Sequence, residues 1–113
     1  MACENARKEN DMRLLMLVTF PTARFNHLWR SGQVGPKIRE ILEDLKPQAA
    51  YFGRQTGGQR GAVLVVDIAS EADYVRFTEP WLLAFDAQIE TSVCMTAEDI
   101  GKVDYDALTK KYG

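Results

Sequence analysis

Two residues of this chain are suited by type and setting to move protons. His27, in the stretch PTARFNHLWR, is the only histidine, and an imidazole exchanges protons near neutral pH. Glu90 lies in AQIETSVCM, where a carboxylate directed into a cavity lined by a sheet could act as acid or base. We therefore take His27 and Glu90 as candidate catalytic residues. The simpler interpretation is that His27 is a partly exposed helix residue and that Glu90 lies on an edge strand, solvated or paired with an arginine of a second copy.

Aromatic side chains near these residues could shape a cavity. Trp29 follows His27 closely, and with the neighbouring Asn26 and Arg30 it could form one rim of a cavity. Trp81 follows Pro80 in EPWLLAF, and a proline that restarts the helix would place this ring at a pocket lip. Most aromatic side chains serve the core, where they bury large areas. The candidate ligand-binding residues are Trp29, Tyr51, Arg54 and Trp81.

The stretch YFGRQTGGQRG, residues 51–61, carries four glycines and two arginines. It lacks the GK[ST] ending of a phosphate-binding loop, and no helix is expected after it. Adjacent glycines between two strand-like runs predict a hairpin turning at Gly57-Gly58. The expected pairs are Thr56 with Gln59, Gln55 with Arg60, Arg54 with Gly61 and Phe52 with Val63. In that register Arg54 and Arg60 point to opposite faces, which disfavours a joint anion clamp, although one of them could reach a partner subunit or a pocket mouth.

No spacing of ligands indicates a metal site or a cofactor. The lone histidine has no HxxxH or HxxE partner, and the two cysteines, Cys3 and Cys94, do not form a CxxC pair. Cys94 lies in a predicted strand, which favours inert packing over a reactive thiol. We predict no metal, no cofactor and a reduced, cytoplasmic setting.

Composition limits the class of protein. The chain has 113 residues, 46% hydrophobic and 27% charged, with a formal net charge of −2, which indicates one globular domain. Fourteen basic residues are spread among sixteen acidic ones, so nucleic acid is a disfavoured partner. The run LLMLVTF is far shorter than the roughly 20 residues of a membrane helix. We also expect no membrane partner.

The chain divides into a leader, a domain and a tail. Residues 1–11 are expected to be a flexible leader, with Met12 as an alternative start. Residues 12–96 form the domain, and residues 97–113 a C-terminal helical tail that begins with a cap at Thr96 and Asp99. The expected strands are 13–20, 48–55, 62–68 and 87–95; the expected helices run from 21 to 46, broken near Gly32–Pro36, and from Ser70 onward, broken at Pro80.

This order predicts an α+β fold with the ferredoxin-like βαββαβ arrangement. It implies one four-stranded antiparallel sheet of order 4-1-3-2, with the helices on one face. The first and third strands are apolar on both sides, so the other face would remain bare and apolar. We expect a homodimer in which two such sheet faces pack together.

The segments LVTFP, GPKIREILEDLKP, GGQRGAVLVVDI and EPWLLAF, with the interrupted helix FNHLWRSGQVG, resemble the dimeric α+β barrel superfamily of ferredoxin-like proteins. They resemble in particular a group of small bacterial proteins of uncharacterised activity, over Met12 to about Lys102. The superfamily includes muconolactone isomerases, cofactor-free monooxygenases, polyketide cyclases, haem-binding members and non-catalytic sensing domains.

The resemblance implies the fold and the dimer, whereas the function has to come from the site. The expected function is the binding of a compact, largely apolar organic molecule, with a cofactor-free isomerase, cyclase or monooxygenase as the enzyme classes. The alternative is a non-catalytic dimer for ligand sensing or protein interaction.

Overall fold

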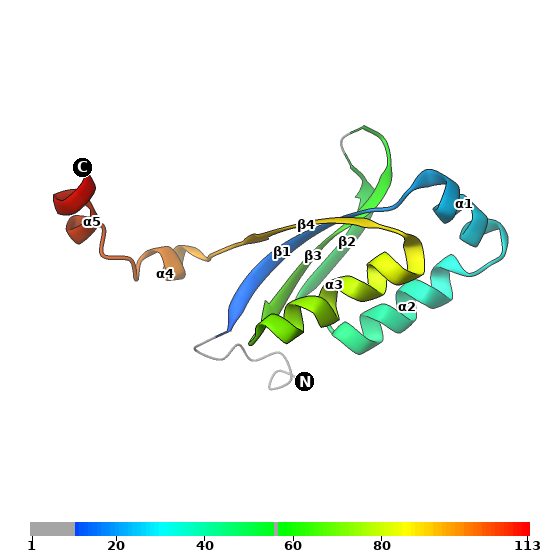
Figure 1. Cartoon of the computed structure of the whole chain (residues 1–113), viewed down its shortest axis with the longest axis horizontal. Helices are drawn as coiled ribbons and strands as arrows, with labels where there is room; N and C mark the ends of the chain where they lie inside the picture. The colour runs from blue at the N-terminus through cyan, green and yellow to red at the C-terminus, as the bar shows by residue number, and fades with distance from the viewer. Residues whose placement is uncertain (1–10, 56) are drawn as a thin grey trace.

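The computed structural model describes residues 11–55 and 57–113. The predicted leader up to residue 10, Cys3 and the expected pairing of Thr56 lie outside the described residues. The elements are β1 (Met12–Thr19), α1 (Thr22–Arg30), α2 (Val34–Leu45), β2 (Ala49–Arg54), β3 (Arg60–Ile68), α3 (Glu71–Phe85), β4 (Gln88–Val93), α4 (Ala97–Ile100) and α5 (Tyr105–Tyr112) (Figure 1).

The fold is α+β, with one antiparallel sheet of four strands. The strand order is β2-β3-β1-β4, which has the same neighbours as the predicted order counted from the opposite edge. The helices depart from a plain βαββαβ arrangement. The described ranges contain five of them, because the first helical region forms two separate helices and two more follow β4. None of the described helices is long and apolar enough to cross a membrane.

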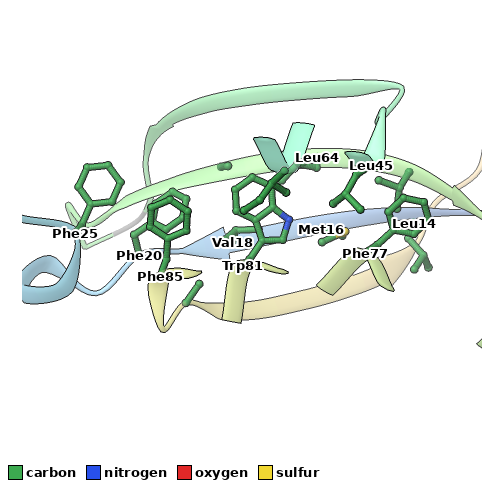
Figure 2. Packing of buried hydrophobic residues seen from close by; sticks show 14 of the residues in the cluster. Leu14, Met16, Val18, Phe20, Phe25, Leu45, Leu64, Phe77, Trp81 and Phe85 are labelled. Atoms are coloured by element: carbon green, nitrogen blue, oxygen red, sulfur yellow. The ribbon is translucent and has the colours of Figure 1, made fainter. Parts of the chain in front are cut away.

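The core lies between the sheet and the helices α2 and α3. In β1 the side chains of Leu14, Met16 and Val18 are buried, and between them the neighbouring residues are only partly buried, as the two-residue repeat of a strand requires. Figure 2 shows these side chains meeting the large rings of α3. The buried hydrophobic cluster consists of Leu14, Met16, Val18, Phe20, Phe25, Leu28, Ile41, Leu45, Ala62, Leu64, Val66, Ile68, Phe77, Trp81, Phe85 and Ala87.

Helix α3 corrects the prediction of a break at Pro80. The helix is continuous, and Pro80 lies inside it. A proline removes one N–H donor from a helix interior but does not by itself prevent the helix from continuing. Buried side chains occur both before Pro80, at Phe77, and after it, at Trp81. Packing against the core therefore anchors both halves of the helix. The predicted start is confirmed, because the Ser70 hydroxyl accepts a hydrogen bond from the Asp73 amide at 3.3 Å.

The hairpin between β2 and β3 differs from the prediction by one residue in register. The Gln55 amide donates to the Gln59 carbonyl at 2.7 Å, so the loop contains the three residues 56–58 in place of two. Gly57 and Gly58 both have positive φ, as predicted for the turn. The extra loop residue pairs Arg54 directly with Arg60 and Gly53 with Gly61. The two arginines therefore share one face of the hairpin, and the expectation of opposite faces was wrong.

The second face of the sheet, here called the uncovered face, is packed by none of the described helices (Figure 1). Its central residues Leu15, Leu17, Val63 and Val65 are partly buried by their neighbours in the sheet. On the edge strand β2, Tyr51 pairs with Val63 of β3 and is 71% exposed. The uncovered face is therefore apolar at its centre.

Beyond β4 the chain leaves the domain. Residues 96–113, here called the C-terminal arm, contain α4 and α5 and extend away from the sheet (Figure 1). Thr96 and Asp99 form the capping box predicted for the start of this segment. No residue of the arm is buried.

Candidate functional site

A cavity of about 290 Å³ opens between α1 and the hairpin end of the sheet. We call it the Arg60 pocket. It is lined by Phe20, Phe25, Trp29, Ile38, Phe52, Gly53, Arg60 and Gly61. Its walls are therefore aromatic, with one charged side chain among them.

Local structure brings these residues together. Phe25 and Trp29 are four residues apart on α1, a spacing that places both side chains on one side of a helix. The amide of Phe20, at the end of β1, donates to the Arg60 carbonyl at 2.9 Å and ties the turn into α1 to the start of β3. Phe52 enters from β2, where it pairs with Ala62 on the side of the sheet that faces the core.

The guanidinium of Arg60 is held in a fixed place. Its central carbon lies 4.7 Å from the centroid of the Phe25 ring and 5.8 Å from that of Trp29. One of its terminal nitrogens donates to the Asn26 side-chain oxygen at 2.7 Å. Both contacts are typical of an arginine whose planar group is oriented in advance.

Arg60 has no anionic partner within the described ranges. None of the described carboxylates lies within 4.0 Å of its nitrogens as an ion pair. Asn26 is neutral, so the positive charge of a partly buried side chain is left uncompensated. Because a guanidinium has five N–H donors, further donors are available to a ligand.

Two further cavities lie at other parts of the domain. One of about 450 Å³, here called the α3 groove, is lined by Met12, Ile68, Ala69, Ser70, Glu71, Tyr74 and Val75. The other, of about 200 Å³, follows the edge strand β2 and is lined by residues 51–55 and 61–63. The α3 groove is the larger and more apolar of the two.

The predicted site residues are dispersed over these places. Trp29 lines the Arg60 pocket and is 64% exposed. Tyr51 and Arg54 line the small cavity along β2. His27 is exposed on α1, and Glu90, which pairs with Leu17, lies exposed on the uncovered face. Neither His27 nor Glu90 lines any of these three cavities, and they lie on different elements, α1 and β4.

Trp81 corrects the expectation of a pocket lip. Its side chain has 0% exposure and packs against Phe20 and Phe85, with ring centroids 6.2 Å away in both cases (Figure 2). Its indole N–H is buried and finds no acceptor among the described residues. The space between helices and sheet is therefore filled by the core rather than by a cavity at Trp81.

Arg60 gained its importance from the structure. From the sequence, Arg60 is predicted only as an alternative to Arg54 at a pocket mouth, because a two-residue loop would direct the two side chains to opposite faces. The spacing of Phe25 and Trp29, with Asn26 between them, was the available signal. It indicated one aromatic side of α1, but not that β3 would bring an arginine to it.

Among residues 11–55 and 57–113, no group of three or more histidine, cysteine or acidic side chains could hold a metal ion. Comparisons with protein-family models, with curated proteins and with solved structures find no match to this chain. The Arg60 pocket is therefore the feature of this chain that points most directly to a function.

Proposed function

We propose that this protein binds a compact, largely apolar organic molecule in the Arg60 pocket, and that the molecule carries an acidic group. The observation that carries the proposal is the guanidinium of Arg60 beside two aromatic rings, with no anionic partner among the described residues. A carboxylate is the group that a planar guanidinium binds best, through two parallel hydrogen bonds. The apolar part of the molecule would then contact Phe25, Trp29 and Phe52.

The size of the pocket limits the ligand. A volume of about 290 Å³ lies at the lower end of the range for small-molecule sites, which runs from about 300 to 1,000 Å³. An aromatic acid of one or two rings satisfies this limit. Larger ligands would have to leave part of their surface in water.

The positions of His27 and Glu90 support binding without catalysis. A general acid or base has to lie within hydrogen-bond reach of the atom it protonates. His27 and Glu90 line no part of the Arg60 pocket, and Glu90 lies on the far side of the sheet. We therefore favour the non-catalytic, ligand-sensing alternative over the isomerase, cyclase or monooxygenase classes.

The same proposal includes the ferredoxin-like relationship and a homodimer formed through the uncovered face. Leu15, Leu17 and Val63 on that face are apolar, and Tyr51 at its edge is largely exposed. Packing such faces across a twofold axis removes apolar area from water in both copies. This arrangement is that of a dimeric α+β barrel.

Isothermal titration calorimetry with benzoate and 1-naphthoate tests the ligand class, with benzamide and 1-naphthamide as neutral counterparts. We expect the acids to bind at least tenfold more tightly than the amides. Arg60→Gln should abolish that difference by removing the charge while keeping a polar side chain with N–H donors. Equal binding of acids and amides by the unaltered protein would contradict the proposal.

Arg54→Gln is the matched control, because Arg54 pairs with Arg60 across the hairpin but does not line the Arg60 pocket. It removes the same charge at a neighbouring position. We expect the affinity for the acids to fall less than threefold. A loss as large as that of Arg60→Gln would show a general effect of positive charge instead of a specific site.

A further inference from the structure

The C-terminal arm has the features of a segment that needs a surface to pack on. Its helix α5 has eight residues, and isolated helices shorter than about 12 residues are marginal in water. Nevertheless its ends are well specified, because the Asp104 carboxylate accepts from the Ala107 amide at 3.0 Å and Lys110 and Lys111 lie in the last turn. The sequence thus encodes a helix whose stability has to come from contacts.

One side of α5 is apolar and exposed. Tyr105, Leu108 and Tyr112 follow the spacing i, i+3 and i+7, which places them on one stripe. They are 52%, 47% and 75% exposed. A stripe of this kind on a short helix is typical of a docking segment.

The arm is held away from its own domain. At its base an Arg13 side-chain nitrogen lies 3.1 Å from the Asp99 carboxylate, and both side chains are partly buried, with 17% and 20% exposure. The radius of gyration is 17.1 Å, compared with about 13 Å for a compact chain of this size. The base of the arm is therefore fixed while its apolar stripe projects outward, as Figure 1 shows.

The domain carries a surface that matches the stripe. The α3 groove, of about 450 Å³, is concave and mostly apolar, with Met12, Ile68 and Val75 among its lining residues. The groove also contains Glu71, in the first turn of α3, whereas Lys110 and Lys111 stand beside the stripe of α5. Apolar surface and charge are thus complementary between two parts of the same sequence.

We propose that the C-terminal arm of one copy packs into the α3 groove of a second copy, and that the exchange is reciprocal. In a twofold dimer each copy then gives one arm and receives one, so both apolar surfaces are removed from water. The stripe residues Leu108 and Tyr112 enter the groove, and Lys111 lies near Glu71. The exchange is separate from the Arg60 pocket, which lies at the other end of the sheet.

Cysteine cross-linking between two different copies tests the exchange. In a background of Cys3→Ser and Cys94→Ser, one chain carries Leu108→Cys and a co-expressed chain of different length, extended by a tag, carries Val75→Cys. A disulfide needs Cα atoms within about 7 Å, so a mixed disulfide reports contact between arm and groove. We expect a mixed dimer on a non-reducing gel, at least tenfold more abundant than with the control below.

The control replaces Val75→Cys by Leu83→Cys, which is 75% exposed on the same helix but does not line the groove. Equal cross-linking with both partners would overturn the proposal. A single chain carrying both Leu108→Cys and Val75→Cys adds a second criterion. If that chain forms its disulfide internally and remains a monomer in light scattering, the arm folds back on its own domain and the exchange is wrong. Loss of acid binding in Arg60→Gln leaves this result unchanged, so the two proposals fail separately.

Discussion

At their centres the two faces of the sheet carry similar residues but have different surroundings. On the covered face, Met16 and Leu64 have 0% exposure because α2 and α3 close over them. On the other face, Leu17 and Val63 are only partly buried, although they are just as apolar and lie on the same two strands. The difference comes from what covers each face rather than from residue type. A strand that is apolar on both sides therefore indicates two packing surfaces, of which this chain closes one.

The largest expected effect separates the two faces with adjacent residues of β3. Val66 is 1% exposed in the core, whereas Val65 lies on the uncovered face. Val66→Asp buries a carboxylate among hydrocarbon side chains, which costs several kcal/mol, and we expect it to prevent folding. Val65→Asp should preserve the fold and shift the dimer toward monomer, because only the exchanged arms would then hold two copies together. Circular dichroism reports the fold, and light scattering at micromolar concentration reports the oligomer.

Val65→Thr serves as the control for Val65→Asp, because it keeps the shape of the side chain without a charge. It should remain dimeric. A Val65→Asp protein that is folded and just as dimeric as the unaltered protein over a dilution series would show that the uncovered face contributes nothing to the interface. A monomer in the unaltered protein would have the same meaning.

A smaller effect on stability is expected near the hairpin, where a side chain lies across the uncovered face at Gly61. The Gln55 side chain crosses Gly61 and donates to the Val18 carbonyl at 3.2 Å. A Cβ at Gly61 would collide with that side chain and with the Val18 carbonyl, which is backbone and cannot move away. Gly61→Ala should therefore lower the free energy of unfolding by about 1–3 kcal/mol in a urea titration.

Gly53→Ala is the matched control, because Gly53 pairs with Gly61 in the sheet and has open space where a Cβ would stand. We expect its free energy of unfolding to change by less than about 0.5 kcal/mol or to increase slightly. If both variants lose the same stability, the cost arises from strand conformation and not from the crossing of Gln55.

The smallest expected effect on stability concerns Pro80 in α3, one of the two helices that cover the core. Pro80 leaves the carbonyl of Arg76 without its usual N–H donor inside α3. Pro80→Ala should restore that hydrogen bond and raise the free energy of unfolding by about 1 kcal/mol. Thermal unfolding measures the gain, with Leu83→Ala, 75% exposed on the same helix, as a near-neutral reference. A less stable Pro80→Ala variant would mean that the core depends on a bend at Pro80.

Much of the architecture could be predicted from the sequence, because it depends on short-range patterns. The apolar runs of β1 and β3, the broken helix before Leu45 and the caps at Ser70 and Thr96 are local signals, and the structure confirms them. Pro80 misled the prediction because buried packing on both sides of a residue can outweigh its helix propensity.

The candidate site could not be predicted in the same way. One additional loop residue placed Arg54 on the same face as Arg60, since a shift of one residue exchanges the two faces of the shifted strand. Phe25 reaches Arg60 through the packing of α1 beside the start of β3. The glycine pair Gly57-Gly58 is compatible with loops of two or three residues. The position of Arg54 therefore depended on a register, and the Arg60 pocket on a contact between α1 and β3, and the local sequence leaves both open.

The two tryptophans of this chain have opposite environments, and this makes them natural optical probes. Trp81 is fully buried in the core, and Trp29 is 64% exposed beside the Arg60 pocket. Indole fluorescence shifts to shorter wavelength as water is excluded, so Trp81 supplies the blue part of the emission and Trp29 the red part. A single emission spectrum therefore contains separate signals for the integrity of the core and for occupancy of the pocket.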